Sequence, residues 1–195
     1  RSKGDKNEKK TLIKYILRPF SHWFTNCYMA NSIDCGIWQF GKKTYDRGKV
    51  NIFKTVIDAN ANAFNAKLRE DTRKEFGWEN KIVYGFIGRY VPQKNPLFLI
   101  DIFNEIAKKQ ENAILVMIGF GELENEMHDR IESYGVTDKV IDLGRRDDIK
   151  QFYNAFDAFL LPSLYEGMPV VGIEAQCSGP VSYTHLRAHE TPEHL

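Results

Sequence analysis

Two carboxylates near the end of the chain have the type and spacing of a ligand-binding site. Glu166 lies in the turn Ser163–Gly167, and Glu174 follows it with seven residues between them. An apolar run ends at Pro162 before this turn, and a helix can begin near Pro169 after it. Such a turn lies at the carboxyl end of a strand, where open α/β sheets bind ligands. Because helix N-termini attract phosphate, carboxylates beside one indicate a ligand with hydroxyls and phosphate, such as a nucleotide sugar.

Two cationic side chains, Arg89 and Lys94, follow the mostly apolar run Lys81–Gly88. If this run is a strand, both lie at its carboxyl end and face the same crevice as Glu166. A diphosphate leaving group gains negative charge as its bond to the sugar breaks, so fixed cations there favour the transition state. Arg can hold two phosphate oxygens, whereas Lys acts as a point charge. Alone the two would be ordinary solvated charges; beside the Glu pair they predict phosphate binding.

Strand and helix patterns alternate with short connections over residues 81–179. This alternation predicts an α/β fold with a parallel sheet, helices on its faces and right-handed crossovers. Strands are expected at 27–30, 50–54, 81–88, 113–118, 140–143 and 158–161, and helices at 32–40, 67–76, 96–109, 122–134, 149–155 and from 169. Asp147 or Asp148 is expected to cap the helix at 149–155.

The segment SLYEGMPVVGIEAQCSG at residues 163–179 closely resembles the signature of retaining GT-B glycosyltransferases of glycosyltransferase family four. The resemblance runs from about residue 26 to 179 and is strongest over the last hundred of these. It implies a GT-B type fold with a Rossmann-like parallel sheet. It also implies transfer of a sugar from a UDP or GDP donor to a hydroxyl of a glycan or lipid-linked acceptor, with retention. Polysaccharide or glycolipid assembly at the cytoplasmic side of a bacterial membrane is the setting that it implies.

The resemblance also assigns roles to the cationic turn and to Glu174. Gly88 and Arg89 with Lys94 match the family's pattern G-R-x-x-x-x-K, in which the Arg and the Lys contact the donor diphosphate. Glu174 matches the carboxylate that holds the ribose hydroxyls. Attack from the same face as the departing diphosphate is implied, without an agreed enzyme nucleophile.

The resemblance also assigns a role to the turn Ser163–Gly167. Glu166 would hold the transferred sugar and the distal phosphate, together with the backbone at Gly167 and Met168. Because Pro169 lacks an N–H group, the next amide donor in this stretch is Val170.

Two glycine turns complete the implied donor site. Gly119, in the turn Gly119–Glu122, resembles the family's turn that lines the donor cleft, and Gly144 with Arg145 and Arg146 resembles the loop that borders the base. Both arginines can equally be surface charges. No Asp-x-Asp metal motif accompanies the site, and in this family Arg, Lys and a helix dipole replace the divalent ion. We therefore expect no metal and no cofactor besides the donor itself.

Three other functions are considered, and the residues disfavour the first of them. Glu166 and Glu174 could be the acid and the nucleophile of a glycosidase, whose carboxyl groups lie about 5 to 9.5 Å apart. However, a hydrolase has no need of the cationic turn or of a helix N-terminus that faces phosphate. The two alternatives that stay open are a GT-B sugar-nucleotide epimerase and a nucleotide-binding module without activity.

The composition limits the partners and the compartment. The 195 residues include 27 basic and 26 acidic side chains, so the basic surplus of a nucleic-acid binder is absent. The three cysteines have neither metal-site spacing nor the even number of a disulfide set, which favours a reducing, cytoplasmic compartment. No apolar run approaches the roughly 18 residues of a membrane-spanning helix.

Both ends of the chain differ from its middle. Thr11–Phe24 predicts a basic amphipathic helix that either packs on its own domain or makes a peripheral membrane contact. Residues 181–195 are polar and rich in His, and they are interpreted as a non-native tail of translated adapter sequence. His185, His189 and His194 have the spacing of metal ligands, but their segment leaves the pattern where a core strand is needed.

We therefore expect three parts. Residues 1–55 would be the remnant of an N-terminal acceptor domain with the crossover, residues 56–180 a truncated nucleotide-sugar-binding domain, and residues 181–195 the tail. Because the chain begins at Arg1, it is interpreted as a fragment. By itself it is expected to be inactive and poorly stable, since the acceptor cleft is incomplete and a sheet edge is exposed.

Overall fold

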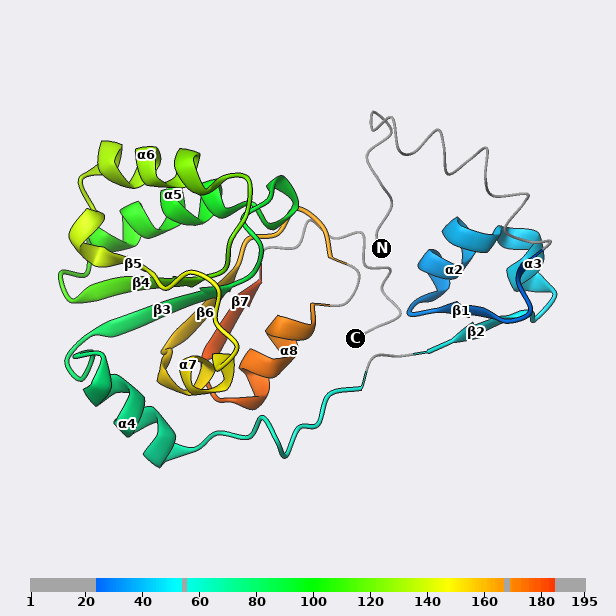
Figure 1. Ribbon diagram of the computed structural model, residues 1–195, viewed down its shortest axis with the longest axis horizontal. Helices are drawn as coiled ribbons and strands as arrows, with labels where there is room; N and C mark the ends of the chain where they lie inside the picture. Colours follow the sequence, from blue (N-terminus) through cyan, green and yellow to red (C-terminus); the bar gives the residue numbers. More distant parts are fainter. Residues whose placement is uncertain (1–23, 54–55, 167–168, 185–195) are drawn as a thin grey trace. The chain divides into compact units, whose positions relative to one another are not determined.

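Figure 1 presents a computed structural model of the chain, which describes residues 24–53, 56–166 and 169–184. The chain divides into two compact units. The smaller unit extends to Val56 and includes Glu166, and the larger unit comprises Ile57–Tyr165 and resumes at Pro169. The division into an acceptor-domain remnant and a donor domain stays a prediction.

The smaller unit contains a pair of short parallel strands and two helices. Strand β1 (Tyr28–Ala30) pairs with β2 (Val50–Ile52), and helices α2 (Ile33–Phe40) and α3 (Lys42–Asp46) connect them. Ser32 caps α2, because its hydroxyl accepts a hydrogen bond from the backbone N–H three residues later. Helix α3 was not predicted. The predicted helix at 11–24 lies outside the described residues except for its last residue.

The larger unit is built on one parallel sheet of five strands in the order β5-β4-β3-β6-β7 (Figure 1). The strands are β3 (Ile82–Ile87), β4 (Ala113–Ile118), β5 (Val140–Asp142), β6 (Ala158–Leu161) and β7 (Val181–Thr184). All neighbouring strands are parallel. The predicted fold class, a Rossmann-like parallel sheet flanked by helices, is therefore confirmed.

Helices cover both faces of this sheet (Figure 1). Helices α5 (Pro96–Ala107) and α6 (Glu124–Tyr134) pack on one face, and α4 (Ala66–Glu75), α7 (Ile149–Ala155) and α8 (Val170–Cys177) pack on the other. Every side chain of β4 is buried, because successive residues of a strand point to opposite faces and both faces are covered. The sheet is thus the centre of two apolar cores.

The strand order places a topological switch point between β3 and β6. From β3 the chain moves outward to β4 and β5, and it then returns to the other side of β3 to form β6. The carboxyl ends of the strands at such a switch point are where open α/β sheets bind ligands. This is the edge where the sequence predicted the site.

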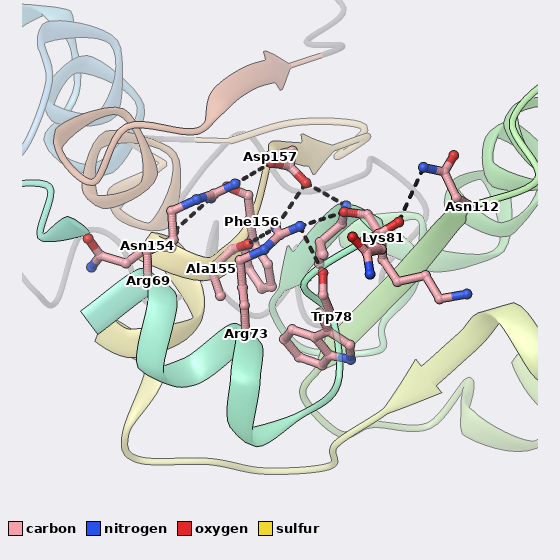
Figure 2. A network of polar contacts seen from close by, with 11 residues as sticks. Arg69, Arg73, Trp78, Lys81, Asn112, Asn154, Ala155, Phe156 and Asp157 are labelled. Carbon is pink, nitrogen blue, oxygen red and sulfur yellow. Dashed lines mark hydrogen bonds and ion pairs between the residues drawn. The ribbon is translucent and has the colours of Figure 1, made fainter. Parts of the chain in front are cut away.

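An ionic network ties α4 to the opposite, amino-terminal edge of the sheet (Figure 2). Asp157, just before β6, accepts hydrogen bonds from Arg69, from Arg73 at 3.1 Å and from the Val83 backbone N–H at 2.8 Å. Arg73 is only 8% exposed. It also donates to the carbonyl oxygens of Trp78, Lys81 and Ala155. These bonds position α4 against two neighbouring strands.

Strand β7 contradicts one prediction. The chain was expected to leave the α/β pattern after Pro180, yet Val181–Thr184 pairs in parallel with β6. Backbone pairing requires no buried side chain, and Val and Tyr favour strands. Val181 and Tyr183 are 69% and 70% exposed, so this strand adds little to the core. The non-native origin of residues 181–195 stays a prediction, and the three histidines lie outside the described residues.

Candidate ligand-binding site

The loops that follow β3 and β6 are hydrogen-bonded to each other at the switch point. The β3 loop is residues 88–95 and includes the 3₁₀ turn Pro92–Lys94; the β6 loop is residues 162–166. The Leu164 N–H group donates to the Gln93 carbonyl oxygen at 2.9 Å, and the Gln93 side-chain amide donates to the Tyr165 carbonyl oxygen at 3.1 Å. The turn that carries the two predicted cations is therefore fixed beside the β6 loop.

The β3 loop presents both predicted cations at the carboxyl edge of the sheet. Arg89 is exposed, and Lys94 is half-buried at the end of the 3₁₀ turn. The Lys94 Cδ atom would lie 3.8 Å from a Cβ atom built on Gly88, so the lysine stem runs close over this glycine. Asn95 then adopts a left-handed conformation (φ 53°) and turns the chain into α5. The loop thus brings Gly88, Arg89 and Lys94 to one edge.

The turn after β4 packs backbone to backbone against the β3 loop. The Gly88 N–H donates to the Ile118 carbonyl oxygen at 3.0 Å, and the Tyr90 N–H donates to the Phe120 carbonyl oxygen at 2.9 Å. A Cβ atom at Gly119 would lie 1.9 Å from the Gly88 carbonyl oxygen. Only glycine therefore fits at position 119. Its role in lining a donor cleft stays a prediction.

The loop after β5, residues 143–148, gives different surroundings to Arg145 and Arg146, which the sequence could not distinguish. Arg145 is exposed, and its guanidinium lies 5.8 Å from the ring centre of Phe120, which is 50% exposed. Arg146 instead holds both carboxylate oxygens of Asp148, at 2.7 and 2.6 Å, and lies over the Phe152 ring. Arg145 is thus presented with an aromatic face, whereas Arg146 is used within the loop.

Asp148 also corrects a prediction about capping. It stands at the N-terminal boundary of α7, but its side chain makes no capping hydrogen bond. Its carboxylate binds Arg146 and the Gln151 side chain instead, because a charged bidentate partner outcompetes a backbone amide. The hydrogen bond from Arg146 lowers the pKa of Asp148.

Helix α8 follows the β6 loop and carries the second predicted carboxylate. It begins at Val170, directly after Pro169, and the N–H group of Val170 has no acceptor inside the helix. Glu174, one turn into α8, is half-buried, and its Oε2 atom accepts a hydrogen bond of 2.9 Å from the Tyr153 hydroxyl. Burial and then the charge of Glu174 raise the pKa of Tyr153, so this hydroxyl remains a donor.

The end of the β6 loop leaves part of the predicted site untested. Glu166 is half-buried and groups with the smaller unit. Gly167 and Met168, whose backbone was expected to bind the distal phosphate, lie outside the described residues. The roles of these three residues stay predictions.

Sequence reasoning missed a buried pair that supports the site. Tyr90 is fully buried in the β3 loop, and its hydroxyl donates to Asp142 Oδ1 at 2.8 Å. The same oxygen accepts a hydrogen bond of 2.9 Å from the Gly144 N–H. Asp142 was hidden inside a predicted strand. The one signal in the sequence for this pair was the position of Tyr90 between Arg89 and Lys94. The contact of Tyr153 with Glu174 was also missed, and the sequence held no signal for it, because an aromatic residue on a helix usually belongs to the core.

Comparison with known proteins identifies the family. Residues 69–181, more than half of the chain, match the family described as glycosyl transferases group 1. The chain belongs to this family. The matched residues include most of α4, the sheet through the start of β7, and the loops at its carboxyl edge.

Curated relatives of this glycosyltransferase family support the assignment. The chain is 30% identical over 147 residues to the putative glycosyltransferase EpsF of Bacillus subtilis, which covers 75% of this chain and 38% of EpsF. It is 36% identical over 103 residues to the Escherichia coli UDP-Gal:alpha-D-GlcNAc-diphosphoundecaprenol alpha-1,3-galactosyltransferase, covering 51% and 27% of the two chains. The chain therefore spans about a third of the length of the curated relatives that it matches.

Solved structures agree with the fold. Anabaena Alr3699/HepE in complex with UDP-glucose superposes with a TM-score of 0.77 and 22% identity, over 91% of this chain and 49% of that one. WaaG, a glycosyltransferase involved in lipopolysaccharide biosynthesis, gives a TM-score of 0.69 and 21% identity, over 80% and 43%. The predicted GT-B type is thus confirmed for the fold. Among the described residues, no helix is long and apolar enough to cross a membrane.

Proposed function

We propose that this chain supplies the donor-binding part of a retaining glycosyltransferase of family four, which uses a UDP or GDP sugar. Arg89 and Lys94 bind the diphosphate and stabilise its growing charge as the glycosidic bond breaks. Glu174 accepts hydrogen bonds from the ribose hydroxyls. Glu166, with the backbone of residues 167, 168 and 170, holds the sugar and the distal phosphate.

The observation that carries this proposal is the pairing of the β3 and β6 loops. The bonds of Gln93 to Leu164 and Tyr165 place a cationic turn beside the loop that leads to a helix N-terminus. A cationic turn and the amide groups at the start of α8 at one edge form a site for a dianionic phosphate group. The crystal structure of HepE with UDP-glucose supports a nucleotide sugar as the ligand class.

The test is nucleotide binding to the chain, measured by calorimetry with UDP, GDP and ADP. We expect one nucleotide to bind, and Arg89→Ala and Glu174→Ala each to weaken it on the order of tenfold, because each removes a charged hydrogen-bonding group. Arg130→Ala is the matched control. Arg130 pairs with Asp101 between α6 and α5 at 2.9 Å, so its loss should leave the affinity unchanged.

Two outcomes would reject the donor-site assignment. If the wild-type chain is folded and binds none of the three nucleotides, the fold is present without a donor site. Equal weakening by Arg130→Ala and Arg89→Ala would show that general charge, and not the β3 loop, attracts the ligand. Circular dichroism of every variant separates these outcomes from unfolding.

Retention and the acceptor belong to the whole enzyme in our proposal. The Escherichia coli relative, whose name specifies a diphosphoundecaprenol-linked acceptor, supports a glycan or lipid-linked acceptor. We further propose that transfer takes place at the cytoplasmic face of a membrane. Transfer by the full-length enzyme from an α-linked donor should yield an α-linked product, which proton NMR of the anomeric centre reads directly. A β-linked product would contradict retention.

A further inference from the structure

We propose that Tyr153 is a positioning residue for Glu174, and that it makes this site selective for nucleotides with an intact ribose diol. The inference rests on the proposed function, because it requires Glu174 to face the ribose. What it adds is a buried hydroxyl, from a different helix, that fixes where the carboxylate oxygens point.

The hydroxyl of Tyr153 is held rigidly. The residue lies on α7 and is 1% exposed, and its ring packs edge-on against Phe159 of β6 at 5.7 Å between ring centres. A buried ring packed in this way keeps one rotamer, so its hydroxyl stays at one place. That place is 2.9 Å from Glu174 Oε2.

The bond leaves one carboxylate oxygen of Glu174 for a ligand. Among the described residues, only Tyr153 donates a hydrogen bond to this side chain, and it uses Oε2. An ionised carboxylate is purely an acceptor, and the two hydroxyls of a ribose are donors. A half-buried Glu without this anchor would populate several rotamers and would have to lose that freedom when a ligand binds. Fixing it beforehand increases the affinity for the diol.

The experiment compares ribonucleotide with 2′-deoxy- and 3′-deoxynucleotide binding to the chain by calorimetry, with the base that the wild type prefers. In the wild type we expect each missing hydroxyl to weaken binding on the order of tenfold. In Tyr153→Phe the ribonucleotide should bind several-fold more weakly, and the preference over both deoxynucleotides should largely disappear. A purely structural role of Tyr153 would weaken all three ligands equally.

Tyr84→Phe is the matched control. Tyr84 lies on β3, and its hydroxyl donates to the Gln110 side chain at 2.9 Å. Gln110 precedes β4, so this bond lies toward the amino-terminal edge of the sheet, away from the candidate site. This variant loses a tyrosine hydrogen bond to a neutral group, so we expect a smaller loss of thermal stability and an unchanged diol preference. Glu174→Gln serves as the second reference and should lose the preference as Tyr153→Phe does.

The outcomes separate the two proposals. If the wild type binds no nucleotide, the proposed function fails. If it binds and Glu174→Gln removes the diol preference while Tyr153→Phe keeps it, the proposed function stands and the role of Tyr153 is wrong. Should Tyr153→Phe not fold, ¹³Cζ-tyrosine NMR replaces it. The resonance that Glu174→Gln shifts must then also shift with added nucleotide, and a resonance that stays unmoved overturns the inference.

Discussion

The hydroxyl of Tyr90 donates a hydrogen bond of 2.8 Å to Asp142, and this bond joins the loop after the central strand β3 to the end of β5. Asp142 also accepts from the Gly144 N–H group, so one carboxylate fixes two of the loops at the carboxyl edge. Burial, followed by the charge of Asp142, raises the pKa of Tyr90. The tyrosine therefore remains a donor throughout the physiological pH range.

Removal of this hydroxyl should loosen the loops. We expect Tyr90→Phe to lower the free energy of unfolding by about 1.5 to 3 kcal/mol, because it removes a buried hydrogen bond to a charged group. Urea denaturation measures this loss. Tyr134→Phe removes the bond of an exposed tyrosine to Asp101 and should cost clearly less. A larger loss for Tyr134→Phe would refute a supporting role of Tyr90.

The buried Arg73 should dominate the stability of α4. Arg73→Met removes one donor from each of the three carbonyl oxygens that it binds. It also removes one of the two donors to Asp157 Oδ2, which keeps the bond from the Val83 N–H group. We expect a loss of about 3 kcal/mol in the free energy of unfolding, as for other broken buried ion pairs. Arg130→Met breaks a surface pair with Asp101 and should cost less than about 1 kcal/mol. Equal losses in urea denaturation would contradict the network in Figure 2.

Asp157 should make the free energy of unfolding depend on pH. Burial alone would raise its pKa, but the Val83 N–H and the two arginines outweigh burial and hold the pKa below the ordinary value of 3.8. A depressed folded-state pKa adds stability above the unfolded value, and this stability is lost as the pH falls through the folded value.

Urea midpoints at pH 6 and pH 3 test this dependence. We expect Asp157→Asn to be less stable than the wild type at pH 6, and the difference to shrink toward pH 3, because below about pH 4 the unfolded wild-type chain takes up a proton on this carboxylate. Other carboxylates titrate in both proteins and cancel in the comparison. A difference of the same size at both pH values would exclude Asp157 as the source.

Gly119 should tolerate no side chain. A Cβ atom there would lie 1.9 Å from the Gly88 carbonyl oxygen, so Gly119→Ala must push the loops after β3 and β4 apart. We expect a loss of about 1 to 3 kcal/mol in stability and weaker nucleotide binding. Gly172→Ala on α8 is the control. Its nearest neighbours lie 3.7 Å away, and alanine favours helices, so stability should hold or rise. Thermal unfolding compares the two.

The sheet and its helices could be predicted from the sequence because each has an unambiguous pattern. Strands β4 and β6 and helix α7 have the predicted bounds, since apolar runs and helical periodicity are local properties. The prediction of a site at the carboxyl edge rested on the order of strands and turns. The ligand-binding roles of its residues stay predictions. Strand β7 was missed because its exposed side chains carry no burial pattern.

The contacts between loops could not be predicted in this way. The bonds of Gln93 to the β6 loop and of Tyr153 to Glu174 join residues far apart in the sequence, and no periodicity encodes them. Asp147 or Asp148 was assigned to a helix cap because capping is a local pattern. The Asp148 side chain binds Arg146 instead, and this preference depends on the folded loop.

The distance along the chain between Arg69 and Asp157 determines when this ion pair can form during translation. These partners are 88 residues apart. At 5 to 20 residues per second, a ribosome makes the carboxylate roughly 4 to 18 seconds after the arginine. Helix α4 has 10 residues, too few for an isolated helix to be stable in water. During that interval we expect the segment to remain unfolded and accessible to chaperones and proteases, and to become protected only once β6 has been translated.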